Sequence, residues 1–293
     1  MKKGLILGLS LIVIMLTACR SQPTPTQSRP TMPAPTSQIT SQRHFYPQWN
    51  ADLHIIRIKP GNEYTIEPKI SSSVDMQSAD NSQVNSQVII AINAGFFDPV
   101  NQKSTSHITI ASQVAADSEQ NERLIQNPNL KPYLSQIVNR SEFRRYECER
   151  EFRYAITRYR TKIPKDCQLV DAIGGGPQLL PELTVIEEAF FDPKTGRDPI
   201  GYNQPNSRSA IGITADGDIL IALVAQTDVS GGLTLPQLAQ RLKTAGAVTA
   251  LNLDGGTSSA LFYNGTTIVG KRDDNNQPIV RPVKSVIVVK KRS

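Results

Sequence analysis

The chain has 293 residues and a formal net charge of +6, and its length is sufficient for a single domain with a sizeable core. Seven arginines lie between Arg140 and Arg160, but glutamates interleave with them. This mixture favours a salt-bridged, solvated face and argues against nucleic acid as a partner.

The first residues are typical of an export signal. Lys2 and Lys3 precede an apolar run from Leu5 to Leu16 that is too short to span a bilayer comfortably. The run ends in LTAC, which resembles a lipobox, so residues 1–18 are predicted to be a lipoprotein signal peptide and Cys19 the lipidated residue. We therefore expect a bacterial cell-envelope protein that is lipid-anchored on an extracytoplasmic membrane face. An ordinary signal peptide with a chance cysteine is the alternative.

The segment after the signal is predicted to be a disordered tether. Residues 19–43 are rich in Pro, Thr, Ser and Gln and nearly devoid of large apolar side chains. Such a segment cannot bury enough surface to offset the entropy lost on ordering. The folded domain is accordingly expected over residues 44–293, and no internal repeat is visible.

Two cysteines remain once Cys19 is assigned to lipid. In an oxidising compartment Cys148 and Cys167 are predicted to form a disulfide. No CxxC motif or nearby histidine supplies further zinc ligands. No metal-ligand residues and no cofactor are assigned, and the metal requirement of the reaction stays open. Residues 129–167 have a helical composition and are predicted to be a helical insertion that this disulfide closes.

Strand patterns dominate the rest of the chain. Alternating residues on either side of Pro60-Gly61-Asn62 predict a hairpin of Leu53–Ile58 with Tyr64–Ile66. Val88–Asn93 is an apolar run of strand length. In residues 169–181, LVDAIGGGPQLLP, a short strand runs into three glycines.

The second half adds another hairpin and one clear helix. Ser209–Thr214 and Ile219–Ala225 flank an Asp-Gly turn, which predicts a hairpin. Thr234 and Gln237 have the spacing of a helix capping box. Further strands are expected at Val248–Leu253 and Val286–Val289. These elements predict an α+β fold, with mixed twisted β-sheets and hairpins packed with a few helices, in a single catalytic domain.

Four segments share a pattern in which an apolar strand ends in glycine beside a polar side chain: NAGFFDP (93–99), DAIGGGP (171–177), NSRSAIG (206–212) and NLDGGTSS (252–259). Glycines allow backbone N–H groups to crowd around an anion. Arg208 is the one cation in these segments, and a guanidinium suits phosphate oxygens. We therefore expect the four segments to form one site.

In this order the four motifs resemble the phosphodiester glycosidase family, from about Val88 to Val289. Ala94 and Thr257 stand where many members have glycine, and residues 129–167 resemble an insertion. The resemblance implies hydrolysis of the glycosidic bond of a sugar 1-phosphodiester, such as an N-acetylglucosamine-1-phosphodiester, by a carbohydrate-directed hydrolase. The expected partners are this substrate and the membrane, and the oligomeric state is left open.

The resemblance also assigns site residues. Asp254 would act at the anomeric carbon, Arg208 would bind the phosphate, and Asn93 would hold a sugar hydroxyl or orient Asp254. The other predicted substrate- and phosphate-binding residues are Gly95, Phe96, Gly174, Gly175, Gly176, Ser209, Asn252, Gly255, Gly256, Thr257, Ser258 and Ser259. Glycosidases usually employ two carboxylates, and the second stays open among Asp98, Asp171, Glu187 and Glu188.

Two other hydrolase classes fit poorly. A serine hydrolase would need a histidine partner, and the three histidines accompany no nucleophile-elbow pattern. No lysine follows the glycines at P-loop spacing. The alternative that remains is a non-catalytic envelope module that binds anionic glycans or cell-wall phosphodiesters through the same pocket.

Overall fold

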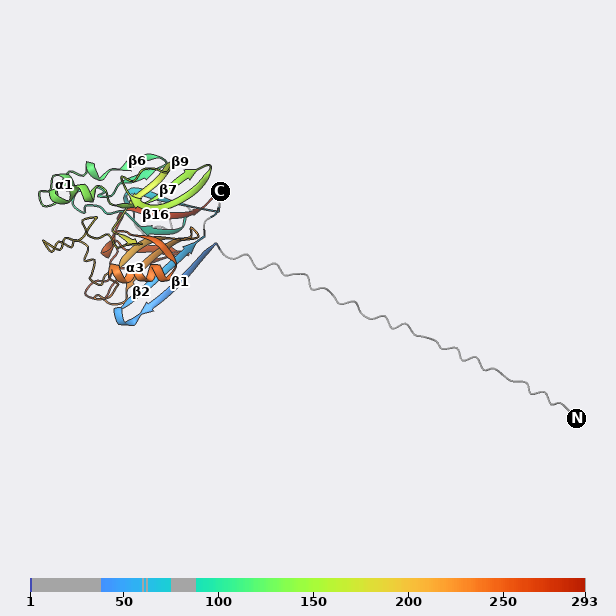
Figure 1. Cartoon of the computed structure of the whole chain (residues 1–293). Coiled ribbons are helices and arrows are strands. Elements are labelled where there is room, and N and C mark those ends of the chain that lie inside the picture. Colours follow the sequence, from blue (N-terminus) through green and yellow to red (C-terminus); the bar gives the residue numbers. More distant parts are fainter. Residues whose placement is uncertain (2–37, 60, 62, 75–87, 293) are drawn as a thin grey trace. The chain divides into compact units, whose positions relative to one another are not determined.

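Three antiparallel sheets and a few short helices make up the domain (Figure 1). The computed structural model describes residues 1, 38–59, 61, 63–74 and 88–292. Residues 37–293 form one compact unit. The predicted signal peptide, the lipidation site Cys19 and residues 19–37 of the predicted tether lie outside the described residues. Within the described part of the chain, no helix has the length and apolar character needed to cross a bilayer.

The first sheet has six strands in the order β1-β2-β12-β11-β13-β10. Their bounds are β1 Ile39–Tyr46, β2 Ala51–Ile58, β10 Gln178–Leu180, β11 Arg208–Thr214, β12 Ile219–Gln226 and β13 Ala247–Asn252. The hairpin predicted for Ser209–Thr214 and Ile219–Ala225 is confirmed as β11 paired with β12. Every residue of β12 is buried, which is the pattern of a central strand covered on both faces.

The second sheet has five strands in the order β15-β14-β4-β16-β3. Their bounds are β3 Tyr64–Val74, β4 Val88–Asn93, β14 Ala260–Tyr263, β15 Thr266–Val269 and β16 Val283–Lys291. The apolar run at 88–93 is confirmed as β4, which pairs with β14 and β16.

The third sheet has five strands in the order β6-β5-β9-β7-β8. Their bounds are β5 Ile108–Ile110, β6 Gln113–Ala116, β7 Ser141–Cys148, β8 Glu151–Arg158 and β9 Cys167–Gly174. The predicted disulfide is confirmed, because Cys148 and Cys167 are bonded directly across the β7–β9 pair.

The helices are short. They are α1 Glu122–Ile125, α2 Leu134–Ile137 and α3 Leu235–Thr244, with 3-10 turns at Pro47–Trp49, Ser118–Gln120, Lys131–Tyr133 and Gly256–Ser258. The predicted capping box of α3 is present, with Thr234 and Gln237 each bonding the other's backbone N–H. Every strand pairing among the described residues is antiparallel, and the α+β prediction is confirmed.

The main core lies where the three sheets meet. On β12, Ile219, Ile221 and Leu223 face this core, together with side chains from β4, β9 and β16. The alternate residues of β12, Leu220 and Val224, pack on the other side against α3. In Figure 1 β16 of the second sheet lies between the β7–β9 region of the third sheet and the α3–β2 region of the first.

The predicted helical insertion is wrong, because its largest part is the β7–β8 hairpin. Glutamate and arginine favour helices by composition, but here they lie on two paired strands. Glu142 and Arg144 are two residues apart, hence on one face of β7, and their charged groups form a buried ion pair. The expected solvated face is confirmed in part: Glu142, Arg144 and Arg145 are buried, whereas six other charged residues of the stretch are exposed, namely Glu147, Glu149, Arg150, Glu151, Arg153 and Arg160.

Two boundaries also differ from expectation. β2 and β3 do not form a hairpin, because Ile58 pairs with Ile219 in the first sheet and Ile66 pairs with Val289 in the second. Residues 39–43, assigned to the tether, belong to β1. β1 is an exposed edge strand, and its polar composition resembles that of a disordered segment.

Candidate active site

The buried side chain of Asn93, at the end of β4, forms hydrogen bonds to three other residues at the predicted site. Its Nδ2 donates to the backbone oxygen of Asp254 at 2.5 Å. Its Oδ1 accepts from Ser209 Oγ at 2.6 Å and from the Ala260 N–H at 3.1 Å. Since Asn93 has no exposed surface, it orients Asp254 rather than a sugar hydroxyl.

A cavity of about 430 Å³ lies beside Asp254, whose backbone is held by this hydrogen bond from Asn93 (the Asn93 clamp). It brings together seven of the predicted residues: Phe96, Arg208, Asn252, Asp254, Gly255, Gly256 and Thr257. Six residues that the sequence analysis did not assign complete its wall: Asp198, Pro199, Ile200, Gly201, Gln204 and Asn206. Asp254 and Arg208, the two residues on which the prediction depends, therefore share one cavity.

Asp254 has an unusual electrostatic environment. Burial of its carboxyl group raises the pKa from 3.8 to about 6, against the opposing effects of Ser258, Arg281 and the Gly255 N–H. The Gly255 N–H donates to Oδ1 at 3.0 Å. The Ser258 hydroxyl lowers the pKa of Asp254 although its geometry falls short of a formed hydrogen bond. A carboxyl with a pKa near 6 can exchange protons close to neutral pH.

Arg208 holds the cavity wall. Its guanidinium donates to the backbone oxygens of Ile200 (2.9 Å), Gly201 (2.6 Å), Gln204 (3.0 Å) and Leu233 (3.3 Å). These bonds use four of the five N–H groups of arginine. Burial lowers the pKa of Arg208 to about 10, and the charge of Asp198 opposes this shift. Arg208 thus positions the 198–204 loop and retains one N–H for a ligand.

The three consecutive glycines do not form the predicted anion cradle. The N–H groups of Gly174, Gly175 and Gly176 donate to the backbone oxygens of His107, Ser141 and Asn252. A Cβ on Gly175 would lie 2.6 Å from the Asn252 oxygen. Gly176 has a φ of +114°, and a Cβ there would lie 2.6 Å from Glu188 Oε2. The glycines are needed for close packing behind the cavity.

Other predicted ligands are also engaged within the protein. The Gly95 and Phe96 N–H groups donate to Ser285 Oγ and Ser106 Oγ, both at 3.0 Å, and the Ser209 hydroxyl serves Asn93. Ser258 and Ser259 are buried and do not line the cavity.

Asn252 has an unused hydrogen-bond acceptor at the edge of the cavity. It lines the cavity, and its Nδ2 donates to the Gly176 oxygen at 2.8 Å. Its Oδ1 is buried and has no partner among the described residues. An unsatisfied buried acceptor is costly, so a donor that reached this atom through a small movement of the cavity wall would stabilise it.

None of the four second-carboxylate candidates lines the cavity. Asp98 accepts hydrogen bonds from Arg123 and the Val100 N–H, and Asp171 is paired with Arg145. Glu188 is buried against Ser141 and Gln178, and Glu187 is exposed.

The second carboxylate in the cavity is Asp198, which the sequence analysis missed. Its Oδ1 and Oδ2 accept from the Tyr202 N–H at 3.0 and 3.1 Å. Sequence offers little signal for Asp198, because the Asp-Pro pair at 198–199 predicts only a turn. The loop reaches the cavity because Arg208 binds the backbone oxygens of Ile200, Gly201 and Gln204.

Two further cations were missed. Arg281 Nη1 donates to Thr257 Oγ1 at 3.1 Å, and Arg281 is the cation that lowers the pKa of Asp254. Lys271 Nζ donates to Asn206 Oδ1 at 3.2 Å. Burial and the charge of Arg208 lower the pKa of Lys271, so two further positive charges lie beside residues of the cavity wall.

The order of the motifs along the chain matches a known family. Residues 86–290 match the phosphodiester glycosidase family. The chain belongs to this family. No curated protein matches the sequence of the chain.

Solved structures show the same fold at low sequence identity. The catalytic domain of zebrafish N-acetylglucosamine-1-phosphodiester α-N-acetylglucosaminidase, auto-inhibited by its pro-peptide, matches with a TM-score of 0.64 and 16% identity over 88% of this chain and 85% of that chain. A hypothetical protein from Synechocystis matches with a TM-score of 0.57 and 17% identity over 87% of this chain. This chain spans 62% of that protein's length. A putative exported protein from Burkholderia pseudomallei gives a TM-score of 0.50 and 14% identity over 82% of this chain and 74% of that chain.

Proposed function

We propose that this chain is an exported hydrolase that cleaves the glycosidic bond of a sugar 1-phosphodiester in the cell envelope. The observation that carries the proposal is that Asp198 and Asp254 line one cavity with Arg208. Paired carboxylates are the usual equipment of glycosidases, and a guanidinium suits a phosphate. Family membership and the zebrafish relative's name support an N-acetylglucosamine 1-phosphodiester as the first substrate to test.

Asp254 takes the role of base in this proposal. Water adds a hydroxyl to the anomeric carbon, the bond from that carbon to the phosphate oxygen breaks, and the phosphate monoester leaves with the bonding electrons. The proton lost by water passes to Asp254. With a pKa of about 6, this carboxylate is mostly ionised at neutral pH and is a stronger base than an ordinary aspartate.

Positive charge in the cavity wall and directly behind it would receive the leaving group. A phosphate monoester is a stable anion, so its departure needs charge stabilisation more than a proton. Arg208 and Lys271 are close enough for Arg208 to lower the pKa of Lys271. A phosphate bound beside them would relieve this repulsion, which supports a phosphate subsite at this wall.

Asp198 takes the role of the second carboxylate. The Tyr202 N–H holds both of its oxygens, which fixes the orientation of the carboxylate on the cavity wall. Its negative charge would stabilise the positive charge that develops at the anomeric centre. The unpartnered Asn252 Oδ1 would accept a sugar hydroxyl after a small movement of the cavity wall.

The test is hydrolysis of an N-acetylglucosamine 1-phosphodiester in ¹⁸O-labelled water. We expect free sugar and a phosphate monoester, with the label in the sugar. Asp254→Asn should give no product, and Asp216→Asn, in the exposed β11–β12 turn, should match the unmodified protein. Label in the phosphate would contradict cleavage at the anomeric carbon. Binding of the diester without any product would identify a binding module instead.

We also propose that Cys19 carries the lipid that holds the enzyme on an extracytoplasmic membrane face. The support is the sequence pattern in which Cys19 follows the apolar run directly. Cells given radiolabelled palmitate should label the unmodified chain but not Cys19→Ser. Equal labelling of the two chains would exclude this residue as the anchor.

A further inference from the structure

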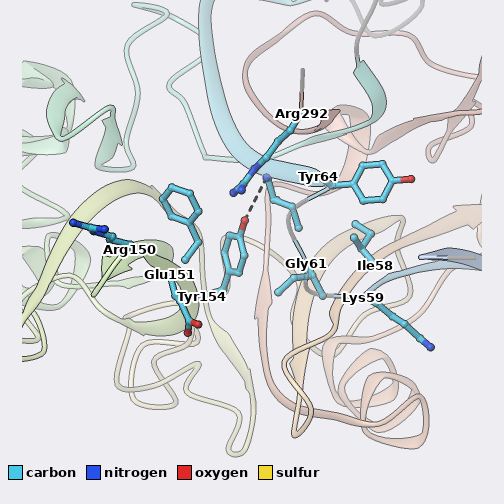
Figure 2. Close-up of a pocket in the computed structure, with 11 residues that line it drawn as sticks. Ile58, Lys59, Gly61, Tyr64, Arg150, Glu151, Tyr154 and Arg292 are labelled. Atoms are coloured by element: carbon cyan, nitrogen blue, oxygen red, sulfur yellow. Dashed lines mark hydrogen bonds between the residues drawn. The ribbon is translucent and has the colours of Figure 1, made fainter.

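A second cavity, of about 320 Å³, lies where the three sheets meet (Figure 2). Ile58 of β2 and Ile219 of β12 come from the first sheet, Ile66 of β3 from the second, and Tyr154 of β8 from the third. These aliphatic side chains are buried and make an apolar floor. The rest of the cavity wall is polar and carries charged side chains.

Cations outnumber acids around this cavity. Lys59, Arg150 and Arg292 line it together with one carboxylate, that of Glu151. The guanidinium of Arg292 stacks on Phe152 at 4.9 Å, and its Nε donates to Thr65 Oγ1 at 3.1 Å. An anion entering the cavity would therefore meet a cation whose position is already set.

A phenol adds a neutral donor to the same wall. Tyr154 Oη accepts from the Ile66 N–H at 3.4 Å, and no described residue accepts its proton. Figure 2 shows the Tyr154 phenol and the Arg292 guanidinium pointing toward one another. A phosphate oxygen between them could accept from both groups.

Arg150 is presented by a rigid turn. Cys148 pairs with Glu151, so the β7–β8 loop has two residues, Glu149 and Arg150, with φ values of 52° and 73°. These angles are those of a type I′ turn, which matches the twist of the flanking strands. The disulfide between Cys148 and Cys167 links the end of β7, next to this turn, to the neighbouring strand β9.

This cavity lies at the end of the sheets opposite the candidate active site. On β12, Val224 pairs with Arg208 of the active site, whereas Ile219, about 17 Å away along an extended strand, lines the second cavity. On β16, Val286 pairs with Asn93, whereas Arg292 follows the other end. Both sheets thus separate the two cavities.

The N-terminal segment enters the domain beside the second cavity. The Lys59 N–H donates to the Gln38 backbone oxygen at 2.8 Å, and Ile39 pairs with Ile58. The stretch from Cys19 to Gln38 can span at most about 65 Å when fully extended. A membrane that holds Cys19 would therefore be within reach of this end of the domain.

We propose that the second cavity binds the phosphate headgroup of an anionic phospholipid. Lys59, Arg150 and Arg292 receive the phosphate, and the domain docks on the membrane with this end. The candidate active site then faces away from the lipid, toward substrates in the envelope. The proposal concerns orientation, and it holds whatever reaction the active site performs.

The test is vesicle flotation with residues 37–293, which form one compact unit and lack Cys19. Vesicles of phosphatidylcholine alone are compared with vesicles that contain 30% phosphatidylglycerol. We expect binding to the anionic vesicles only. The double variant Lys59→Gln, Arg150→Gln should bind them on the order of tenfold more weakly, because each cation near an anionic surface contributes appreciably to binding.

A matched variant separates this site from general charge attraction. Lys131→Gln, Lys243→Gln removes the same charge from exposed residues outside the cavity, and it should keep binding within twofold of the unmodified domain. Equal losses in the two variants would overturn the proposal. So would equal binding to neutral vesicles, or saturable binding of inorganic phosphate by a domain that binds no vesicle.

Discussion

The side-chain amide of Asn93 and the backbone carbonyl of Asp254 are joined by a hydrogen bond of 2.5 Å. This bond ties the end of β4 in one sheet to the residue that follows β13 in another. The same amide oxygen accepts from Ser209 and Ala260. One buried side chain therefore holds together three segments that are far apart in the sequence.

Asn93→Ala should destabilise the domain and lower its activity. It leaves buried groups of Asp254, Ser209 and Ala260 unsatisfied, and we expect a loss of about 3 kcal/mol in the free energy of unfolding. Urea denaturation measures this. Asn129→Ala, at an exposed position, is the control and should change stability by less than about 0.5 kcal/mol. Similar small changes in both variants would show that the Asn93 clamp contributes little.

Asp254→Asn should stabilise the domain at pH 8 more than at pH 4. The folded pKa of about 6 exceeds the ordinary 3.8, so the stability that Asp254 contributes is complete below about pH 4 and is lost as the pH rises through 6. Asparagine does not titrate and avoids this loss, which is about 1–2 kcal/mol after allowance for partial exposure of the residue. Thermal unfolding across this pH range measures the difference.

Asp228→Asn provides a control of opposite sign. Hydrogen bonds from Ser230 lower the pKa of the exposed Asp228 carboxylate, so its stabilising effect is present at neutral pH and is lost in acid. This variant should lose stability at pH 7 and match the unmodified protein in strong acid. If Asp254→Asn behaved in the same way, the raised pKa of Asp254 would be refuted.

The two cavity carboxylates should differ in their pH signatures. If Asp254 is the base, kcat/KM of the unmodified enzyme rises with pH through about 6 and then levels off. Asp198→Asn should lower kcat on the order of 10²-fold or more but keep this rise. A rise that persisted in Asp254→Asn would assign the titration to another group.

Arg208→Lys should loosen the 198–204 loop. Lysine keeps the charge but lacks the planar fork that donates to four backbone oxygens. We expect at least a tenfold lower kcat/KM and faster tryptic cleavage after Arg197. Arg123→Lys, which alters an exposed ion pair with Asp98, is the matched control. Unchanged cleavage at Arg197 would mean that other contacts hold the loop.

Loss of the disulfide should lower the free energy of unfolding but leave kcat nearly unchanged. Cys148 and Cys167 are 19 residues apart, and opening a loop of this size should cost about 3 kcal/mol. Neither cysteine lines the candidate active site, so a Cys148→Ser, Cys167→Ser variant should keep its kcat at 25 °C. A large fall in kcat without a change in urea midpoint would contradict this purely structural role.

Local patterns were sufficient for several elements. The capping box at Thr234, the Asp-Gly turn between β11 and β12 and the apolar run at 88–93 each depend on neighbours within one element. The helical prediction for 129–167 failed because most of this segment forms paired strands, β7, β8 and the start of β9. Arg145 pairs with Asp171, 26 positions away, and no local composition shows such a contact.

Four short motifs were sufficient to predict the phosphodiester glycosidase family and a cavity shared by Asp254 and Arg208, because glycines and charges at strand ends are visible in neighbouring residues. Which polar groups face this cavity depends on how the distant segments pack in the folded domain. Backbone carbonyls from distant segments accept hydrogen bonds from the N–H groups of Gly174 to Gly176, and the loop held by Arg208 brings in Asp198. Hydrogen-bond partners are set by long-range packing. The donors and acceptors that are left without an internal partner, and can therefore bind a substrate, are identified only in the folded structure.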